Sequence, residues 1–324
     1  MNWDLSMAES SAIQRCDNMF VNDKAGNKGF GLLYPFTTEN IAGYIDLFDL
    51  ADKSLLTVGS SGDQVINSIL RNVKDVTLLD INPYAKYYYF LKAAGILEFN
   101  LAEFNRFFRY RNYPKIFKTN KYAFNKDGYE KIIKTLILLD YDSYLFWDEL
   151  FNSYSSCDIR DSLFSGDEHR SPVIENSNLY LQNEINYIET RQKIKKVRPS
   201  FINEDIFNVE LNRNFDNIWL SNIACYLYPK EIKKMTDKFA GSLNENGKLL
   251  IGYLYEIDME TEYNIDWSPI YDLKGDLRLL NEYAPTFQFF TGVDGIKFSE
   301  IGIKDAVLVY QKKIGGSNNG FVKR

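Results

Sequence analysis

The chain has 324 residues, of which 45% are hydrophobic and 25% are charged, as is usual for a globular protein with a substantial core. Its net charge of −6 argues against a general nucleic-acid-binding protein, because such proteins present a basic surface. Cys16, Cys157 and Cys225 are far apart and odd in number, which predicts reduced thiols and no zinc site or disulfide framework.

Residues 1–50 are predicted to form an N-terminal helical segment, in which Thr38 can cap a helix that runs to about Leu50. The first residues lack the basic and apolar regions of a secretion signal. No run in the chain approaches the roughly 18 apolar residues of a membrane span. We therefore expect a cytoplasmic protein and leave peripheral membrane contact open.

A strand, a turn of small residues and a helix are predicted next. The apolar run 55–58 leads into Gly59-Ser60-Ser61-Gly62-Asp63, and apolar residues then follow at helical spacing to about residue 72. A second strand is predicted over 75–83, where Pro83 can start another helix. This order predicts a parallel pair of strands with a right-handed crossover.

Residues 98–199 interrupt the alternation and are predicted to be a large helical insertion. A short strand and turn are predicted over 200–207 and a buried strand over 215–223, followed by a helix, a turn at Glu245-Asn246-Gly247 and a strand over 248–255. Further strands are predicted at 287–290 and 306–311, before a flexible tail at 313–324. We therefore predict an α/β core formed by residues 51–97 and 200–312.

The turn at residues 59–62 has the chemistry of a nucleotide site. Gly59 and Gly62 allow backbone N–H groups to approach a ligand, and the following helix start favours negative charge. Asp80 ends the second strand, 21 residues after Gly59, where a doubly wound sheet places an acid on a ribose. Asp205 follows the next strand, near where an adenine would lie. The alternative is that the glycines only form a tight turn and that Asp80 caps a helix.

The succession VGSSGD, LLDINP, EDIF, WLSN and ENGKLLIG resembles the class I S-adenosylmethionine-dependent transferase fold, over roughly residues 50–97 and 200–312. The resemblance implies a doubly wound, mostly parallel Rossmann-like sheet with an antiparallel closing strand, IKDAVLVYQKK, and S-adenosyl-L-methionine as cofactor. The turn departs from the methyltransferase pattern, since Thr57 replaces an acid and Ser61 and Asp63 replace glycines.

The GSSGD turn, the DINP that follows the second strand and the long insertion are most similar to the diacylglycerol 3-amino-3-carboxypropyl transferases of betaine-lipid synthesis. The resemblance implies three groups of cofactor-binding residues. They are Gly59, Ser60, Ser61, Gly62 and Asp63 for the methionine part, Asp80, Ile81 and Asn82 for the ribose, and Asp205 and Ile206 for the adenine.

The stretch WLSNIACYLYP ends the fourth strand, where the acceptor would face the cofactor. We assign Ser221 to the cofactor site and Asn222 and Tyr226 to catalysis, with the alternative that Asn222 only satisfies backbone groups. His169, the one histidine, is expected to be solvated in its polar loop. The basic run 191–198 either meets an anionic acceptor or membrane surface, or forms the exposed end of a helix.

These patterns predict a transferase that moves a methyl or 3-amino-3-carboxypropyl group from S-adenosylmethionine to a small-molecule or lipid acceptor. The insertion is expected to cap the acceptor. One alternative is a non-catalytic S-adenosylmethionine- or nucleotide-binding module. The other is a nicotinamide-dependent oxidoreductase, although the turn lacks Gly-x-Gly-x-x-Gly. The acceptor and the oligomeric state are left open.

Overall fold

The computed structural model describes residues 33–37, 39, 41–59, 61–109, 120–164, 174–221, 223, 229–252, 277–279, 286–288 and 305–312. The predicted N-terminal segment is therefore described only in part, and the predicted tail lies outside the described residues. Within the described part of the chain, no helix is both long and apolar enough to cross a membrane.

The strands are β1 (Ser54–Val58), β2 (Asp75–Asp80), β3 (Ser200–Asn203), β4 (Phe215–Trp219), β5 (Leu243–Gly252), β6 (Leu277–Leu279), β7 (Thr286–Gln288) and β8 (Asp305–Lys312). The helices before the insertion are α2 (Ile41–Tyr44), the 3-10 helix η1 (Ile45–Leu47), α3 (Asp63–Leu70) and α4 (Tyr84–Glu98). Those that follow are α5 (Leu101–Phe108), α6 (Lys126–Leu139), α7 (Tyr141–Ser153), α8 (Ser156–Leu163), α9 (Ile174–Ser177), η3 (Leu179–Leu181), α10 (Glu184–Ile194) and α11 (Pro229–Ala240).

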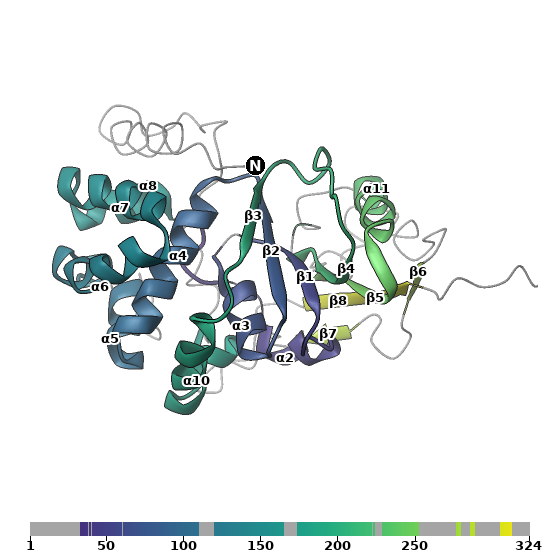
Figure 1. Cartoon of the computed structure of the whole chain (residues 1–324), viewed down its shortest axis with the longest axis horizontal. Helices are drawn as coiled ribbons and strands as arrows, with labels where there is room; N and C mark the ends of the chain where they lie inside the picture. Colours follow the sequence, from purple (N-terminus) through teal and green to yellow (C-terminus); the bar gives the residue numbers. More distant parts are fainter. Residues whose placement is uncertain are drawn as a thin grey trace, which may run out of the picture.

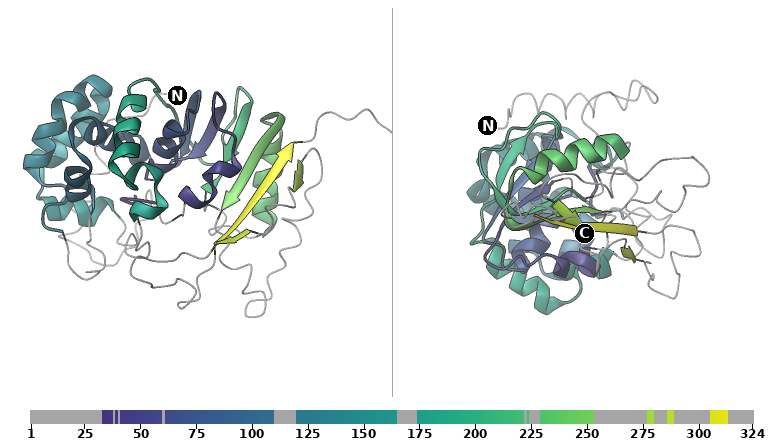
Figure 2. Two further views of the ribbon diagram at one scale, coloured as in Figure 1. Left: turned by 90° about the horizontal axis from the view of Figure 1, so that it is seen from below. Right: turned by 90° about the vertical axis from the view of Figure 1, so that its right-hand side faces the viewer.

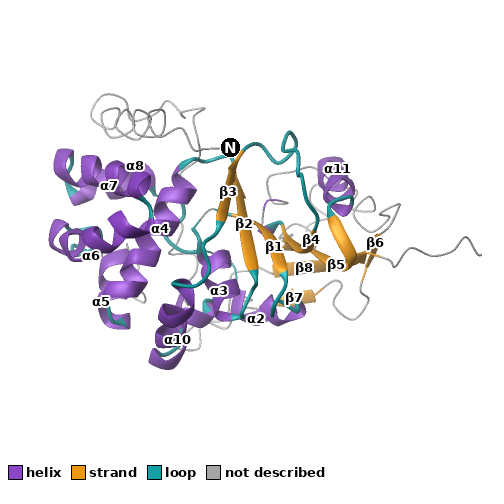
Figure 3. Cartoon of the chain, in the orientation of Figure 1, coloured by secondary structure: helices purple, strands orange, loops and turns teal. Residues whose placement is uncertain are grey.

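One sheet organises the fold, with its strands in the order β3-β2-β1-β4-β5-β8-β6 and with β7 also paired to β8. The strands β1 to β5 pair in parallel, whereas β8 is antiparallel to β5, β6 and β7. The chain reverses its direction of growth at β1, which lies between β2 and β4, as in doubly wound sheets. The predicted Rossmann-like sheet with an antiparallel closing strand is thus confirmed (Figures 1 and 3).

Both faces of the central strands are covered by helices. Leu55 and Leu78 belong to the core shared with α2, α3 and α4, while the next residues, Leu56 and Leu79, belong to the core shared with α11. This alternation follows from the two-residue period of a strand. The right-hand view of Figure 2 shows α11 on one side of the sheet and α2 and α3 on the other. Strands buried on both faces explain the continuous apolar runs in the sequence.

The described part of residues 98–199 is helical, and it divides into two parts. The helices α5 to α8 lie beyond the β3 edge of the sheet, next to α4 (Figures 1 and 2). In contrast, α10 returns to the sheet layer and packs against α3 and α4. Buried residues of both parts belong to the hydrophobic cluster that includes Leu55 and Leu78, so the insertion and the sheet form one packed body.

The basic run 191–198 caps three helix ends. The Arg191 guanidinium donates to the carbonyls of Ile96, at 2.7 Å, and Phe99, where α4 ends. Lys193 Nζ donates to Leu70 O, the last residue of α3, at 2.6 Å. Arg198 reaches Leu139 O at the end of α6, at 3.2 Å. Cations at helix C-termini satisfy unpaired carbonyls and favour the helix dipole, so these three side chains have a structural role.

Several predicted boundaries differ from the structure, and the second strand, for example, ends at Asp80 rather than at residue 83. The helix predicted to reach Leu50 ends as η1 at Leu47. The strand predicted over 215–223 ends at Trp219, because Ser221 adopts a left-handed φ of 54°. The turn predicted at residues 245–247 is an irregularity inside β5, where Asn246 has a φ of 61° and the register with β4 shifts.

Replacing Lys193 by methionine should lower the free energy of unfolding by about 1 kcal/mol, because the last carbonyl of α3 loses a charged donor. Urea denaturation of Lys193→Met measures this change. The matched control is Lys134→Met, which removes an exposed lysine within α6. Equal midpoints for the two variants would contradict the capping role.

Candidate functional site

The predicted cofactor segments meet at one edge of the sheet. The turn 59–62 follows β1, residues 80–82 follow from the end of β2, residues 204–206 follow β3, and Ser221 comes after β4. Because these four strands are parallel neighbours, their carboxyl ends share one edge. In Figure 1 this edge lies toward α2 and the start of α3. It includes the reversal between β1 and β4, where doubly wound sheets bind ligands.

The two glycines shape the turn from β1 to α3. A Cβ on Gly59 would lie 2.1 Å from Leu78 Cδ2, so the packing of β1 on β2 admits no side chain there. Gly62 has a φ of 77°, which favours glycine, and its N–H donates to Gly59 O at 2.7 Å. Both glycines therefore have a packing or backbone reason that is independent of any ligand.

The carboxylate of Asp63 is turned into the protein and is fully buried. Its Oδ1 accepts from Lys92 Nζ at 2.7 Å and from the Tyr180 hydroxyl at 2.8 Å. Its Oδ2 accepts from the Thr37 N–H at 2.6 Å and from the Ser61 hydroxyl at 3.0 Å. Four donors fill the acceptor positions of a carboxylate. Contrary to the expectation that Asp63 contacts the methionine part of a cofactor, its side chain holds the turn in place from below.

The insertion contributes directly to this support. Burial, and then the charge of Asp63, raise the pKa of Tyr180 well above its ordinary value, so its hydroxyl remains a donor. From the adjacent residues of the insertion, Asn178 Oδ1 accepts from Asn67 Nδ2 of α3 at 2.9 Å. Lys92 Nζ lies 4.2 Å from the centroid of the Phe36 ring, in a cation–π arrangement. Helices α3 and α4 and the insertion thus meet around one carboxylate.

Asp80 and its neighbours form the more open part of the edge. Asp80 Oδ1 accepts from the Asn82 N–H at 2.8 Å, and Asn82 Oδ1 accepts from the Tyr84 N–H at 3.0 Å. The Asn82 side chain thus binds the N–H of Tyr84, the first residue of α4, while the Asp80 side chain binds the N–H of Asn82. Between them, Ile81 is 53% exposed, and this side chain offers an apolar surface beside a partly exposed carboxylate.

The loop after β3 is held by two side chains that bind its backbone groups. Asp205 Oδ1 accepts from the Phe207 N–H at 2.7 Å, and Lys238 Nζ donates to the carbonyls of Ile206 and Phe207 at 3.1 and 2.7 Å. Burial lowers the pKa of Lys238, while the nearby Asp205 charge opposes that shift. Ile206 is buried in the core shared with α11, so its side chain has a packing role, and its position beside an adenine stays a prediction.

A buried polar cluster lies beyond the carboxyl ends of the neighbouring strands β1 and β4. We call it the Gln64 cluster, and its members are Glu39, Tyr44, Gln64 and Ser221. Gln64 Nε2 donates to Ser221 Oγ at 3.1 Å. The Ser221 hydroxyl and the Tyr44 hydroxyl each donate to the Glu39 carboxylate. Ser221 has a φ of 54°, a conformation that costs a non-glycine residue about 1–3 kcal/mol and is concentrated at functional sites.

Trp219 positions this cluster from the end of β4. Its ring packs edge-on against the Tyr44 ring and at a tilt against the Phe48 ring. The ring centroids are 5.5 Å apart in each pair. These contacts hold α2 against the sheet and direct Tyr44 toward Glu39. The cluster is therefore built on a packed aromatic layer.

Four important side chains were not predicted from the sequence: Glu39, Gln64, Lys92 and Tyr180. Lys92 carries a signal, since a single lysine in the apolar helix YYYFLKAAGI requires a buried partner. Three predicted residues, Ser60, Asn222 and Tyr226, lie outside the described residues, and so does His169. Among the residues that the structure does describe, no group of three His, Cys, Asp or Glu side chains could hold a metal ion.

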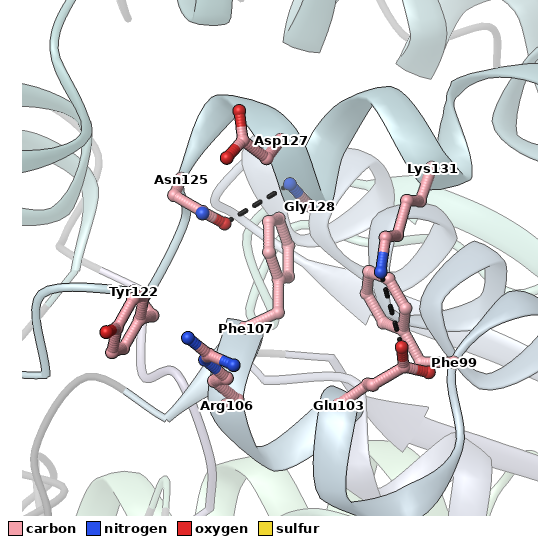
Figure 4. A pocket seen from close by; sticks show the side chains of 9 residues that line it. All are labelled: Phe99, Glu103, Arg106, Phe107, Tyr122, Asn125, Asp127, Gly128 and Lys131. Carbon is pink, nitrogen blue, oxygen red and sulfur yellow. Dashed lines mark hydrogen bonds and ion pairs between the residues drawn. The ribbon is translucent and has the colours of Figure 1, made fainter.

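A separate pocket of about 290 Å³ lies between α5 and the start of α6 (Figure 4). Phe99, Phe107 and Tyr122 supply its apolar walls. Both signs of charge line it. Lys131 pairs with Glu103, and the guanidinium of Arg106 stacks on Tyr122, with its Cζ 3.7 Å from the ring centroid. None of the predicted site residues lines this pocket.

No protein-family model and no curated protein matches this sequence. Among solved structures, the chain is similar to the N-methyltransferase NodS from Bradyrhizobium japonicum WM9 in complex with S-adenosyl-L-homocysteine. The identity is 11%, the TM-score is 0.41, and the match covers 93% of this chain and 98% of that one.

The magnesium protoporphyrin IX methyltransferase ChlM from Synechocystis PCC 6803 matches with 8% identity and a TM-score of 0.37, over 94% of this chain and 96% of that one. A putative S-adenosylmethionine-dependent methyltransferase from Listeria monocytogenes matches with 8% identity and a TM-score of 0.35, over 85% and 98%. The assignment of the fold rests on the order and pairing of the strands in the sheet.

Lys92→Met should lower the free energy of unfolding by about 3–5 kcal/mol, because it leaves the buried Asp63 charge without its cation. Chemical denaturation measures the loss. The control is Lys131→Met, which removes a lysine that is 61% exposed and paired with Glu103, and it should cost less than about 1 kcal/mol. A cost for Lys92→Met no larger than the control would show that Asp63 does not depend on this ion pair.

Proposed function

We propose that this protein is a transferase that uses S-adenosyl-L-methionine. The observation that carries the proposal is the sequence of groups along one sheet edge. A glycine turn and helix start follow β1, and Asp80 with the exposed Ile81 ends the adjacent β2. An adenosine attached to a charged amino-acid chain needs these groups in this order.

The residues fit this cofactor. Asp80 has a partly exposed carboxylate held in place by the Asn82 N–H, which suits hydrogen bonds from the two hydroxyls of a ribose. Ile81 offers an apolar side chain that an adenine ring would cover. The eight-residue helix α3 starts directly after the turn, and the positive end of its dipole favours a carboxylate of the amino-acid chain there.

When bound, the sulfonium of S-adenosylmethionine makes each attached carbon electrophilic. The task of this chain is then to hold the cofactor and to orient an acceptor nucleophile. We extend the proposal to a methyl or a 3-amino-3-carboxypropyl group as the transferred group and to a small molecule or lipid as the acceptor. The leaving product distinguishes the two transfers, since methyl transfer gives S-adenosylhomocysteine and the other gives methylthioadenosine.

The insertion is proposed to border the acceptor side of the site. Its two parts would differ in that role, because Tyr180 and Asn178 already support the turn and α3. Among the hydrogen bonds of the described residues, the helices α5 to α8 make none to the turn or to α3. An experiment that removes the whole insertion would therefore damage the cofactor site itself, and the acceptor role has to be tested with a shorter deletion.

Asp80→Asn should weaken S-adenosylhomocysteine binding by about tenfold or more, because a charge-assisted hydrogen bond to the ribose contributes about 1.5–3 kcal/mol. Asparagine preserves the acceptor for the Asn82 N–H, so the protein should remain folded. Isothermal titration calorimetry measures the affinity. Asp75→Asn, at the opposite end of the same strand, is the matched control and should bind normally. Unchanged affinity in Asp80→Asn would remove the ribose assignment.

A further inference from the structure

The amide oxygen of Gln64 is a buried acceptor that lacks a donor. The side chain is 2% exposed, and in the described part of the chain no group donates to Oε1. An acceptor buried in this way costs about 1–3 kcal/mol unless something pairs with it. The other end of the same amide is engaged, since Nε2 donates to Ser221 Oγ. That hydrogen bond fixes the orientation of the amide, and the amide oxygen is then the atom that still needs a hydrogen-bond donor.

The place of Gln64 in the chain puts this acceptor beside the turn. Gln64 is the second residue of α3, directly after the turn 59–62. Its partner Ser221 follows β4, so the amide links the start of the helix after β1 to the segment after β4, at the reversal of strand order where doubly wound sheets bind ligands.

The charge around Gln64 selects the kind of ligand group. Through Ser221, the amide is linked to the Glu39 carboxylate, which is 1% exposed. A buried carboxylate favours a cation nearby. It disfavours a second carboxylate or a phosphate at the same place. The unmatched oxygen also requires a donor, and an ammonium group supplies both a positive charge and N–H donors.

The side chain at the end of β1 does not compete for this role. Thr57 is fully buried, and its hydroxyl donates to the neighbouring Val58 carbonyl at 3.2 Å. Asp63 is occupied by its four donors. Asn67 Oδ1 is a second buried amide oxygen without a donor among the described residues, but it lies one turn farther along α3, and its Nδ2 is engaged by Asp63 O and Asn178 Oδ1. The Gln64 oxygen is the unmatched acceptor at the start of α3, and it is linked to a buried carboxylate through Ser221.

We infer that the Gln64 amide oxygen, with Glu39 behind it, binds the α-ammonium of the amino-acid end of S-adenosylmethionine. The carboxylate of that end is favoured at the start of α3, at the positive end of the helix dipole. This inference rests on the proposed function and names the residues that recognise one end of the cofactor. It gives Ser221 a defined task as well: its left-handed backbone directs the hydroxyl to Glu39 and leaves the oxygen to accept from Gln64.

Binding of three ligands tests the inference by calorimetry. They are S-adenosylhomocysteine, its analogue with hydrogen in place of the α-ammonium, and methylthioadenosine, which lacks the amino-acid end. The unmodified protein should bind S-adenosylhomocysteine at least tenfold more tightly than the deaminated analogue. Gln64→Met should lose at least tenfold in affinity for S-adenosylhomocysteine, bind the two amino-acid-end ligands equally and keep its affinity for methylthioadenosine.

The control variants separate the outcomes. Gln192→Met makes the same change at an exposed glutamine of α10 and should match the unmodified protein. Glu39→Gln removes the charge and should reduce the preference for the ammonium without changing methylthioadenosine binding. The inference is overturned if Gln64→Met lowers the affinities for all three ligands equally or for none. It is also overturned if the unmodified protein binds S-adenosylhomocysteine and its deaminated analogue equally.

The proposed function fails in a different way. If the unmodified protein binds neither S-adenosylhomocysteine nor methylthioadenosine, the cofactor assignment itself is wrong. If it binds both but Gln64→Met behaves like Gln192→Met, only the ammonium site is wrong. Should Gln64→Met not fold, as judged by circular dichroism, the comparison of S-adenosylhomocysteine with its deaminated analogue on Glu39→Gln and on the unmodified protein still decides the result.

Discussion

The buried ion pair between Asp63 and Lys92 is the interaction on which the candidate site depends. Removing two charges from water is costly, and their attraction offsets that cost only when the geometry and the remaining hydrogen bonds are good. Here Tyr180, Ser61 and the Thr37 N–H supply those bonds. The donors come from four separate parts of the chain. The pair therefore specifies one arrangement of these parts, because any other would leave a charge buried and unmatched.

This constraint explains why the residues of the turn divide into two kinds. Ser61 and Asp63 point into the protein and fix the backbone, and Gly59 and Gly62 let that backbone pass close to β2 and begin α3. The ligand would meet backbone groups and the side chains of neighbouring segments. A comparison of turn residues alone consequently says more about the shape of the turn than about the groups that touch the ligand.

The sheet was predictable from the sequence because its signals are local. Apolar runs at 55–58 and 75–80, the glycine turn and Pro83 each determine structure within a few residues. The Gln64 cluster was not predictable, because its members come from three separate segments, residues 39–44, the start of α3 and the residue after Leu220, which meet only when the chain is folded. The three cations of the basic run were ambiguous for the same reason, since their carbonyl partners lie far away in sequence. Ser221 was predicted as a site residue, but its left-handed backbone ends the strand earlier than the apolar pattern suggests.

The capping of α3, α4 and α6 by one short basic run has a consequence for how the molecule comes apart. α10 and the residues after it cannot detach without leaving carbonyls at the C-terminal ends of α3, α4 and α6 without these donors. An insertion with its own independent stability would unfold as a separate unit. This one shares its last helix with the core, so its loss and the loss of the sheet are coupled. The sheet and the insertion should accordingly unfold as one cooperative unit, in which the candidate site and the insertion form together.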